Sequence, residues 1–277
     1  MNEKNYEFLS EQLKYTGFGD KLNEDLRQQL EKQPTDFKLH AQNSFGKDDT
    51  TATLYFKKSD QSDTVFFNKY DLQLKKENDE NSLQQTFYVN KGTTITLKEG
   101  YNLLDGRAVK KTMTSKENEK YNAWLQLDFK SPTQTGNYEV KQYHQNYGYD
   151  LEKVLAKYPI KELSNEKFKE SLLKSLEKGN LQSATFLANG EEKKLFITPN
   201  VAFKTLHAYD GDHMKVSLQP FTQQQDQKVI IKSDQKVSIE EKPWQSQQPA
   251  VLKEPQQKQE TEKPERKSVQ RQKIKHG

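Results

Sequence analysis

The chain has 277 residues, of which 31% are hydrophobic and 30% are charged, and its formal net charge is +4. This length allows one or two domains, and because no run of about 18 apolar residues occurs we expect no membrane-spanning segment. The chain has no cysteine, which excludes disulfide bonds, thiolate metal sites and a cysteine nucleophile. The opening stretch MNEKNYEFLSEQ lacks the basic and apolar regions of a signal peptide, so we expect a cytoplasmic protein.

Residues 3–32 are predicted to form two helices. Apolar residues recur there at helical spacing on both sides of a glycine-containing break at residues 17–20. Asp20 stands directly before the second periodic run, so we expect it to cap the second helix, and Pro34 ends that helix.

From residue 37 the hydrophobic period changes to two, which predicts β-strands. We expect strands near residues 37–41, 52–56, 64–75 and 84–89, joined by polar loops that suit antiparallel pairing. Residues 1–92 are therefore predicted to be a helical pair with a four-stranded antiparallel meander.

Phe66 and Phe67 are neighbours on the third of these strands. A strand sends neighbouring side chains to opposite faces, so one of the two is expected on a different face from the other. A partner-binding face at Phe66 and Phe67 and packing inside the fold both remain open at this point.

Residues 94–129 predict a short helix, a glycine stop and a β-hairpin. Thr96 and Glu99 have the spacing of a capping box, and Gly106 falls where a helix needs a left-handed terminator. In the second strand of the hairpin, Trp124 points away from the face that carries Ala123, which makes Trp124 a further candidate for partner binding.

The same order of elements recurs 73 residues later, at Gly179. Before that glycine we expect a helix from Asp150 to residue 158 and a second helix capped by Ser164. After it, residues 189–190 are Asn-Gly, a strong hairpin signal, and a strand is expected over residues 202–209. Residues 93–220 are therefore predicted to be two divergent helix–Gly–β-hairpin units, and true duplication and coincidence both remain open.

Several of these stretches carry a family resemblance. The runs LKEGYNLLDGRAV and SKENEKYNAWLQLDF, with a K-x-G/N-x-x-Y/F-N-A signature at residues 116–123, resemble a domain of unknown function in proteins of Bacteroidota mobile elements, especially conjugative transposons. YTGFGDKL and HQNYGYDLEKVL extend the resemblance over about residues 1–220. The resemblance implies the helix–Gly–β-hairpin fold and a setting in mobile elements, and it brings no catalytic or ligand-binding residue with it.

A Tyr-rich stretch follows the first hairpin. Aromatic rings beside amides and a cation can stack on single-stranded bases and hydrogen-bond to them. The candidate nucleic-acid-binding residues are Lys141, Tyr143, His144 and Tyr147. Packing of these tyrosines between the two units, with their hydroxyls in water, is the alternative.

Residues 221–277 are rich in Gln, Lys, Glu and Pro and too poor in apolar residues to offset the entropy of ordering, so we expect a disordered tail. Six cations against the single acid Glu265 give residues 263–277 a charge of +5, which leaves −1 for the rest of the chain. Weak, salt-sensitive contact with nucleic acid is the interpretation we favour for this end, and a solubilising tether is the alternative. The six cations are Lys263, Arg266, Lys267, Arg271, Lys273 and Lys275.

Signatures of catalysis are absent from the sequence. It has no phosphate-binding loop, no dinucleotide fingerprint and no nucleophile elbow, and its five histidines show no helical metal spacing. A tyrosine nucleophile would need an arginine-rich or metal site, yet Arg27 and Arg107 are the only arginines before the tail. We therefore predict no cofactor, no metal and no enzyme activity.

The sequence thus predicts an α+β accessory or interaction protein of a mobile element. We expect a protein partner, and nucleic acid contact through the basic tail and the Tyr-rich strand. The alternatives are an adaptor that binds only protein and a DNA-processing enzyme.

Overall fold

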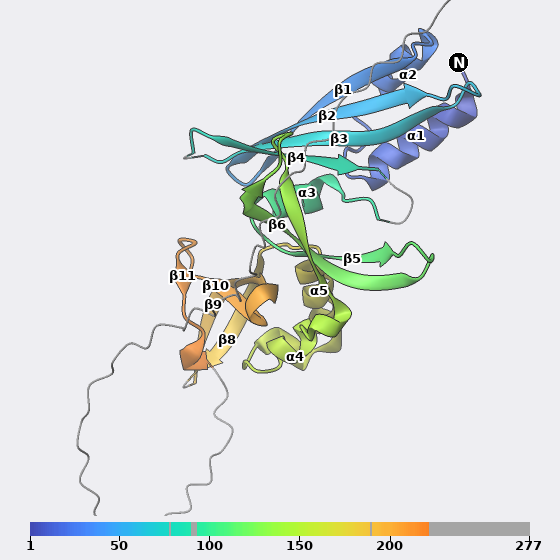
Figure 1. The fold of residues 1–277 in the computed structure, drawn as a ribbon. Coiled ribbons are helices and arrows are strands. Elements are labelled where there is room, and N and C mark those ends of the chain that lie inside the picture. The colour runs from blue at the N-terminus through green and yellow to red at the C-terminus, as the bar shows by residue number, and fades with distance from the viewer. Residues whose placement is uncertain (78, 90–92, 189, 222–277) are drawn as a thin grey trace, which may run out of the picture. The chain divides into compact units, whose positions relative to one another are not determined.

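The computed structural model describes residues 1–77, 79–89, 93–188 and 190–221 (Figure 1). These residues form helices and three antiparallel sheets, which confirms the predicted α+β class. The predicted disordered tail, with its six basic residues, lies outside the described part of the chain.

The N-terminal part consists of α1 (Glu3–Tyr15), α2 (Asn23–Glu31) and a sheet in the order β1-β2-β3-β4, as predicted. The four strands are β1 (Asp36–Phe45), β2 (Asp48–Lys58), β3 (Val65–Lys75) and β4 (Ser82–Tyr88). Asp20 does not cap α2. The N-cap position belongs to Leu22, which has no capping side chain, and Asp20 contributes only its backbone carbonyl, to the amide of Asn23.

The first hydrophobic core lies between these helices and the sheet and continues into the next unit. It runs from Leu9 to Leu127, so residues on both sides of the predicted boundary at 92 and 93 contribute to it. Tyr70 is fully buried there, and its hydroxyl donates to the carbonyl of Ile95 at 2.8 Å. This bond ties the strand β3 to the segment that leads into the next helix.

That helix, α3 (Leu97–Leu104), begins with the predicted capping box. The amide of Glu99 donates to Thr96 Oγ1 at 3.4 Å, and the amide of Thr96 donates to Glu99 Oε2 at 2.9 Å. Lys111, on the strand β5 (Val109–Thr114), pairs with the same carboxylate at 3.0 Å. Gly106 follows the helix with φ +82°, the left-handed conformation that the sequence predicts for it.

The second sheet, in the order β5-β6-β7, is buried on both faces only around the middle of β6. Its strands are β5 (Val109–Thr114), β6 (Lys120–Pro132) and β7 (Tyr138–His144). Val109 and Leu125, which pair across the sheet, join the first core, whereas Ala108 and Trp124 join a second one. The strand β6 therefore separates two cores, as its position in Figure 1 also shows.

The second core belongs to the C-terminal unit. Its helices are α4 (Leu151–Leu155) and α5 (Glu166–Glu177), and its sheet has the order β11-β10-β9-β8. The strands are β8 (Gln182–Ala188), β9 (Glu191–Asn200), β10 (Thr205–Tyr209) and β11 (Lys215–Val216). The edge of β8 is covered by the segment before η2 (Lys161–Ser164), because Ile160 pairs with Phe186.

Three predicted boundaries in this unit are wrong. The helix after Asp150 ends at Leu155, before the proline at 159. Asn165, not Ser164, caps α5, because the Asn165 side chain accepts from the first-turn amides while the Ser164 hydroxyl donates to the carbonyl of Lys161. Residues 201–203 form a 3-10 turn, η3 (Val201–Phe203), so β10 starts only at Thr205.

The two units have the predicted common plan of helix, left-handed glycine, hairpin and third strand. At the offset of 73 residues, the last residue of α3 coincides with that of α5, and the first residue of β5 with that of β8. The glycines have similar φ angles, +82° at Gly106 and +76° at Gly179. True duplication of one ancestral unit stays a prediction.

The units meet where their helices end. Asn102 Nδ2 donates to the carbonyl of Lys178 at 2.7 Å and to Asn180 Oδ1 at 2.9 Å, and Asn102 is fully buried. Gly179 lies at the same place, and a Cβ there would be 2.8 Å from the carbonyl oxygen of Ala108. This junction fixes the second unit against the first.

Candidate functional site

The Tyr-rich stretch forms a surface together with a loop of the second unit. The strand β7 leads into the 3-10 turn η1 (Gln145–Tyr147), and the rings of Tyr143 and Tyr147 lie 4.9 Å apart between centroids. Lys204 Nζ lies 4.7 Å from the Tyr147 ring centroid, and the Tyr147 hydroxyl donates to the carbonyl of Ala202 at 2.8 Å. We call Tyr143, Tyr147, Phe203 and Lys204 the tyrosine surface.

Local backbone geometry holds this surface in place. Gly148 ends η1 with φ +81°, which turns the chain away after Tyr147. Lys204 ends η3 with φ +54°, a left-handed conformation that is uncommon for residues with a side chain. Phe203, between these contacts, is 79% exposed. The surface therefore presents aromatic rings and a cation from both units.

The four residues predicted for nucleic acid binding do not all gather here. Tyr143 and Tyr147 do, but Lys141 Nζ pairs with Asp128 Oδ2 at 2.7 Å, which raises the pKa of Lys141 and lowers that of Asp128. His144 is exposed and stacks on Tyr121, with centroids 5.0 Å apart. The sequence interpretation missed Phe203 and Lys204. An aromatic residue beside a lysine, at the start of the strand predicted over residues 202–209, was the available signal.

Two of the three predicted partner-binding residues are buried, which leaves their side chains out of a partner's reach. Phe67 is 3% exposed in the first core, where it stacks on Phe56. Trp124 is 5% exposed and packs edge-on against Tyr149, because the second core covers the far face of β6. Phe66 is 47% exposed and is the member of this set that a partner could reach.

A cleft of about 1240 Å³ opens where the N-terminal sheet, α3 and the C-terminal sheet face one another. Asp105, at the end of α3, accepts from Lys76 Nζ at 2.6 Å and from an Arg107 terminal nitrogen at 3.0 Å. Lys98 Nζ lies over the rings of Phe45 and Tyr101, 4.3 and 4.5 Å from their centroids. The cleft thus brings Lys76, Lys98 and Arg107 together beside Asp105.

Burial changes the acid–base properties of the groups in this cleft. It lowers the pKa of Lys98, and the nearby positive charge of Arg107 lowers it further. Burial and the charge of Asp105 raise the pKa of Tyr101, whose hydroxyl donates to Asp48 Oδ2 at 2.9 Å. The same two causes raise the pKa of Tyr209 at the end of β10. Both phenols are therefore neutral at physiological pH.

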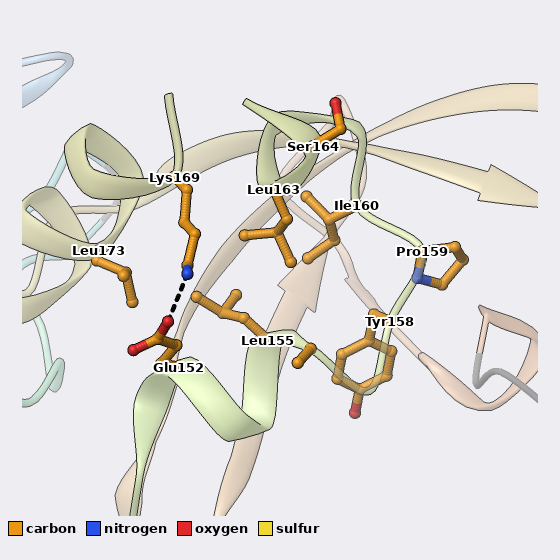
Figure 2. Close-up of a pocket in the computed structure, with 10 residues that line it drawn as sticks. Glu152, Leu155, Tyr158, Pro159, Ile160, Leu163, Ser164, Lys169 and Leu173 are labelled. Carbon is orange, nitrogen blue, oxygen red and sulfur yellow. Dashed lines mark ion pairs between the residues drawn. The ribbon is translucent and has the colours of Figure 1, made fainter. Parts of the chain in front are cut away.

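A smaller pocket of about 380 Å³ lies between α4, η2 and α5 (Figure 2). Leu155, Ile160 and Leu163 line it, and Figure 2 shows the ion pair of Glu152 and Lys169, 2.5 Å between Oε1 and Nζ, beside them. The Glu152 carboxylate raises the pKa of Lys169. The lining suits an apolar group more than a charged ligand.

Among the described residues, no group of three or more His, Asp or Glu side chains is placed to hold a metal ion. In the acidic turn at residues 210–213, the Asp210 carboxylate bonds to backbone amides of the turn itself. Asp210 Oδ1 accepts from the amides of Asp212 and Met214. His213 stacks on Phe196 instead of facing these acids. No helix in the described ranges is long and apolar enough to cross a membrane.

Comparison of the chain with protein-family models, with curated proteins and with solved structures finds no match. The resemblance to a mobile-element family therefore remains a prediction from the sequence.

Proposed function

We propose that this chain is a non-enzymatic accessory protein of a mobile genetic element and that its tyrosine surface binds single-stranded nucleic acid. One observation carries the second half of the proposal: Tyr143, Tyr147 and Lys204 come together from two units and leave Phe203 exposed beside them. The first half rests on the resemblance in the sequence.

Rings of this kind bind bases without sequence preference. Stacking of one base on an aromatic side chain is worth about 1–3 kcal/mol, and a lysine beside it can contact the phosphate backbone. The hydrogen bond from Tyr147 to Ala202 fixes the ring, so little conformational freedom is lost on binding. Lys204 lies over that ring through a weak cation–π contact, which it can exchange for a phosphate.

The six cations of residues 263–277 would add attachment that does not depend on sequence. We place this attachment in the cytoplasm and include a protein partner in the proposal. Phe66, the exposed aromatic of β3, carries the second candidate function, an adaptor that binds protein alone.

The test is fluorescence anisotropy of a labelled oligo-dT titrated with the full chain at low salt. We expect the double variant Tyr147→Ala, Lys204→Gly to bind at least about tenfold more weakly, because it loses one stacking ring and one phosphate contact. Tyr88→Ala is the matched control, since Tyr88 is a 62% exposed tyrosine on the N-terminal sheet.

Replacing the six tail cations by Gln should flatten the salt dependence of binding while the effect of the double variant persists. Equal affinities for the double variant and the Tyr88 control would overturn the role of the tyrosine surface. If the full chain does not bind the oligonucleotide at all, the adaptor is the better account, and Phe66→Ala should then weaken partner capture.

A further inference from the structure

The cleft at the end of α3 contains two buried polar atoms that have no partner among the described residues, Arg107 Nε and Thr198 Oγ1. Thr198 is 1% exposed, and the Arg107 side chain is 11% exposed. A buried polar group without a hydrogen bond is costly, and folded proteins contain few of them. Both of these line the same cleft, so a single ligand could satisfy them together.

Both residues belong to the wall of the cleft. Arg107 follows the left-handed Gly106. A terminal nitrogen of Arg107 donates to Asn102 Oδ1 at 2.8 Å and pairs with Asp105, whereas its Nε makes no hydrogen bond among the described residues. On β9, Leu195 and Ile197 enter the second core. Thr198 therefore lies on the opposite face of the sheet, the one that borders the cleft.

Three cations, Lys76, Lys98 and Arg107, lie together on one wall of the cleft. Two carboxylates lie near them: Asp105 pairs with Lys76 and Arg107, and Asp48 accepts from the Tyr101 hydroxyl. Lys98 rests on aromatic rings, and the charge of Arg107 reaches it strongly enough to lower its pKa. Neighbouring cations favour an anion between them.

We propose that this cleft binds a small molecule through a phosphate or carboxylate group, which accepts hydrogen bonds from Arg107 Nε, Lys98 Nζ and Thr198 Oγ1. The cleft has a volume of about 1240 Å³, which leaves room for a further part of the ligand beside Phe45 and Tyr209. The rim is acidic, with Glu77, Asp79 and Asp212, which disfavours a long polyanion. The ligand is therefore of a different kind from the nucleic acid assigned to the tyrosine surface.

The experiment is isothermal titration calorimetry of the full chain with sodium phosphate, and separately with sodium citrate, in buffers matched with sodium chloride for ionic strength. Thermal melting in the same solutions gives a second readout, because a ligand that binds the folded state raises the melting temperature with concentration. The two anions distinguish a phosphate-bearing ligand from one that bears carboxylates. We expect saturable heat with at least one of them.

Two variants locate the binding. Thr198→Val keeps the shape and removes the hydroxyl, so the free protein should melt higher while affinity for the anion falls about fivefold. Lys98→Met should lower the affinity about tenfold, because it removes a charged donor. Lys47→Met is the control: Lys47 borders the same cleft, but its side chain is 79% exposed and pairs with Glu77.

The proposal is overturned if neither anion gives saturable heat or a melting shift beyond that of chloride. It is equally overturned if Lys98→Met and Thr198→Val bind the anion as the unchanged protein does, or if Lys47→Met loses as much affinity as Lys98→Met. These outcomes do not depend on oligonucleotide binding. The proposal for the cleft and the proposal for the tyrosine surface are therefore tested independently.

Discussion

Gly106 and Gly179 occupy the same place in two units of the same plan, yet their surroundings differ. Both have a left-handed φ. A Cβ on Gly106 would meet only the edge of the Phe129 ring, at 3.6 Å, whereas one on Gly179 would meet the Ala108 carbonyl at 2.8 Å and Val109 Cγ2 at 2.9 Å. The first glycine serves a helix end, and the second also serves the junction between units. A shared backbone conformation therefore does not imply a shared role.

Alanine at the two positions should separate these roles. Gly106→Ala imposes a left-handed conformation on a side chain and should cost about 1–2 kcal/mol of unfolding free energy. Gly179→Ala adds a clash with backbone that cannot move aside, so we expect a loss of about 4 kcal/mol or failure to fold. Urea denaturation followed by circular dichroism measures both. Equal losses would show that the close approach at Gly179 carries no energy of its own.

Asn102 offers a smaller change at the same junction. Its amide bonds two groups of the second unit and accepts from Arg107, so Asn102→Ala should cost about 2–3 kcal/mol through buried groups left without partners. Asn122→Ala is the control, because Asn122 is exposed and bonds only Thr112 among the described residues. A loss at Asn102 no larger than that at Asn122 would mean that packing alone holds the units together.

The third strands of the two units also differ in burial. The smallest expected effect on stability comes from His207, on the third strand of the second unit. The strand β7 is mostly exposed, whereas β10 alternates between buried and half-buried residues. Burial, and then the charge of Lys215, lowers the pKa of His207 below its ordinary value of 6.5. Above pH 6.5, His207 is neutral in the folded and in the unfolded chain, so it does not reduce the unfolding free energy.

As the pH falls below 6.5, the unfolded chain takes up a proton that folded His207 resists, so stability is lost until the pH passes the folded pKa. His207→Gln should therefore show a smaller drop in unfolding free energy between pH 7.5 and 5.5 than the unchanged chain. Identical drops would place the acid sensitivity in other groups.

Local features of the fold could be predicted from the sequence, and features that depend on distant contacts could not. The capping box of α3 and the glycine after it each involve residues close together in the sequence, so the spacing of these residues was sufficient to predict them. The tyrosine surface pairs Tyr147 with Lys204, and no local pattern links residues so far apart. The burial of Trp124 could not be predicted for a related reason: alternation shows which face a side chain takes, but not whether another part of the fold covers that face.

The burial of β6 on both sides has a consequence for the order in which the chain is made. When synthesis reaches the end of this strand, Leu125 can already enter the first core, but Trp124 and Ala108 remain uncovered until residues 149–221 have been made. A nascent chain halted at this point exposes an apolar sheet face, the kind of surface that aggregates or engages chaperones. Completion of the second unit removes that exposure and couples the stabilities of the two cores.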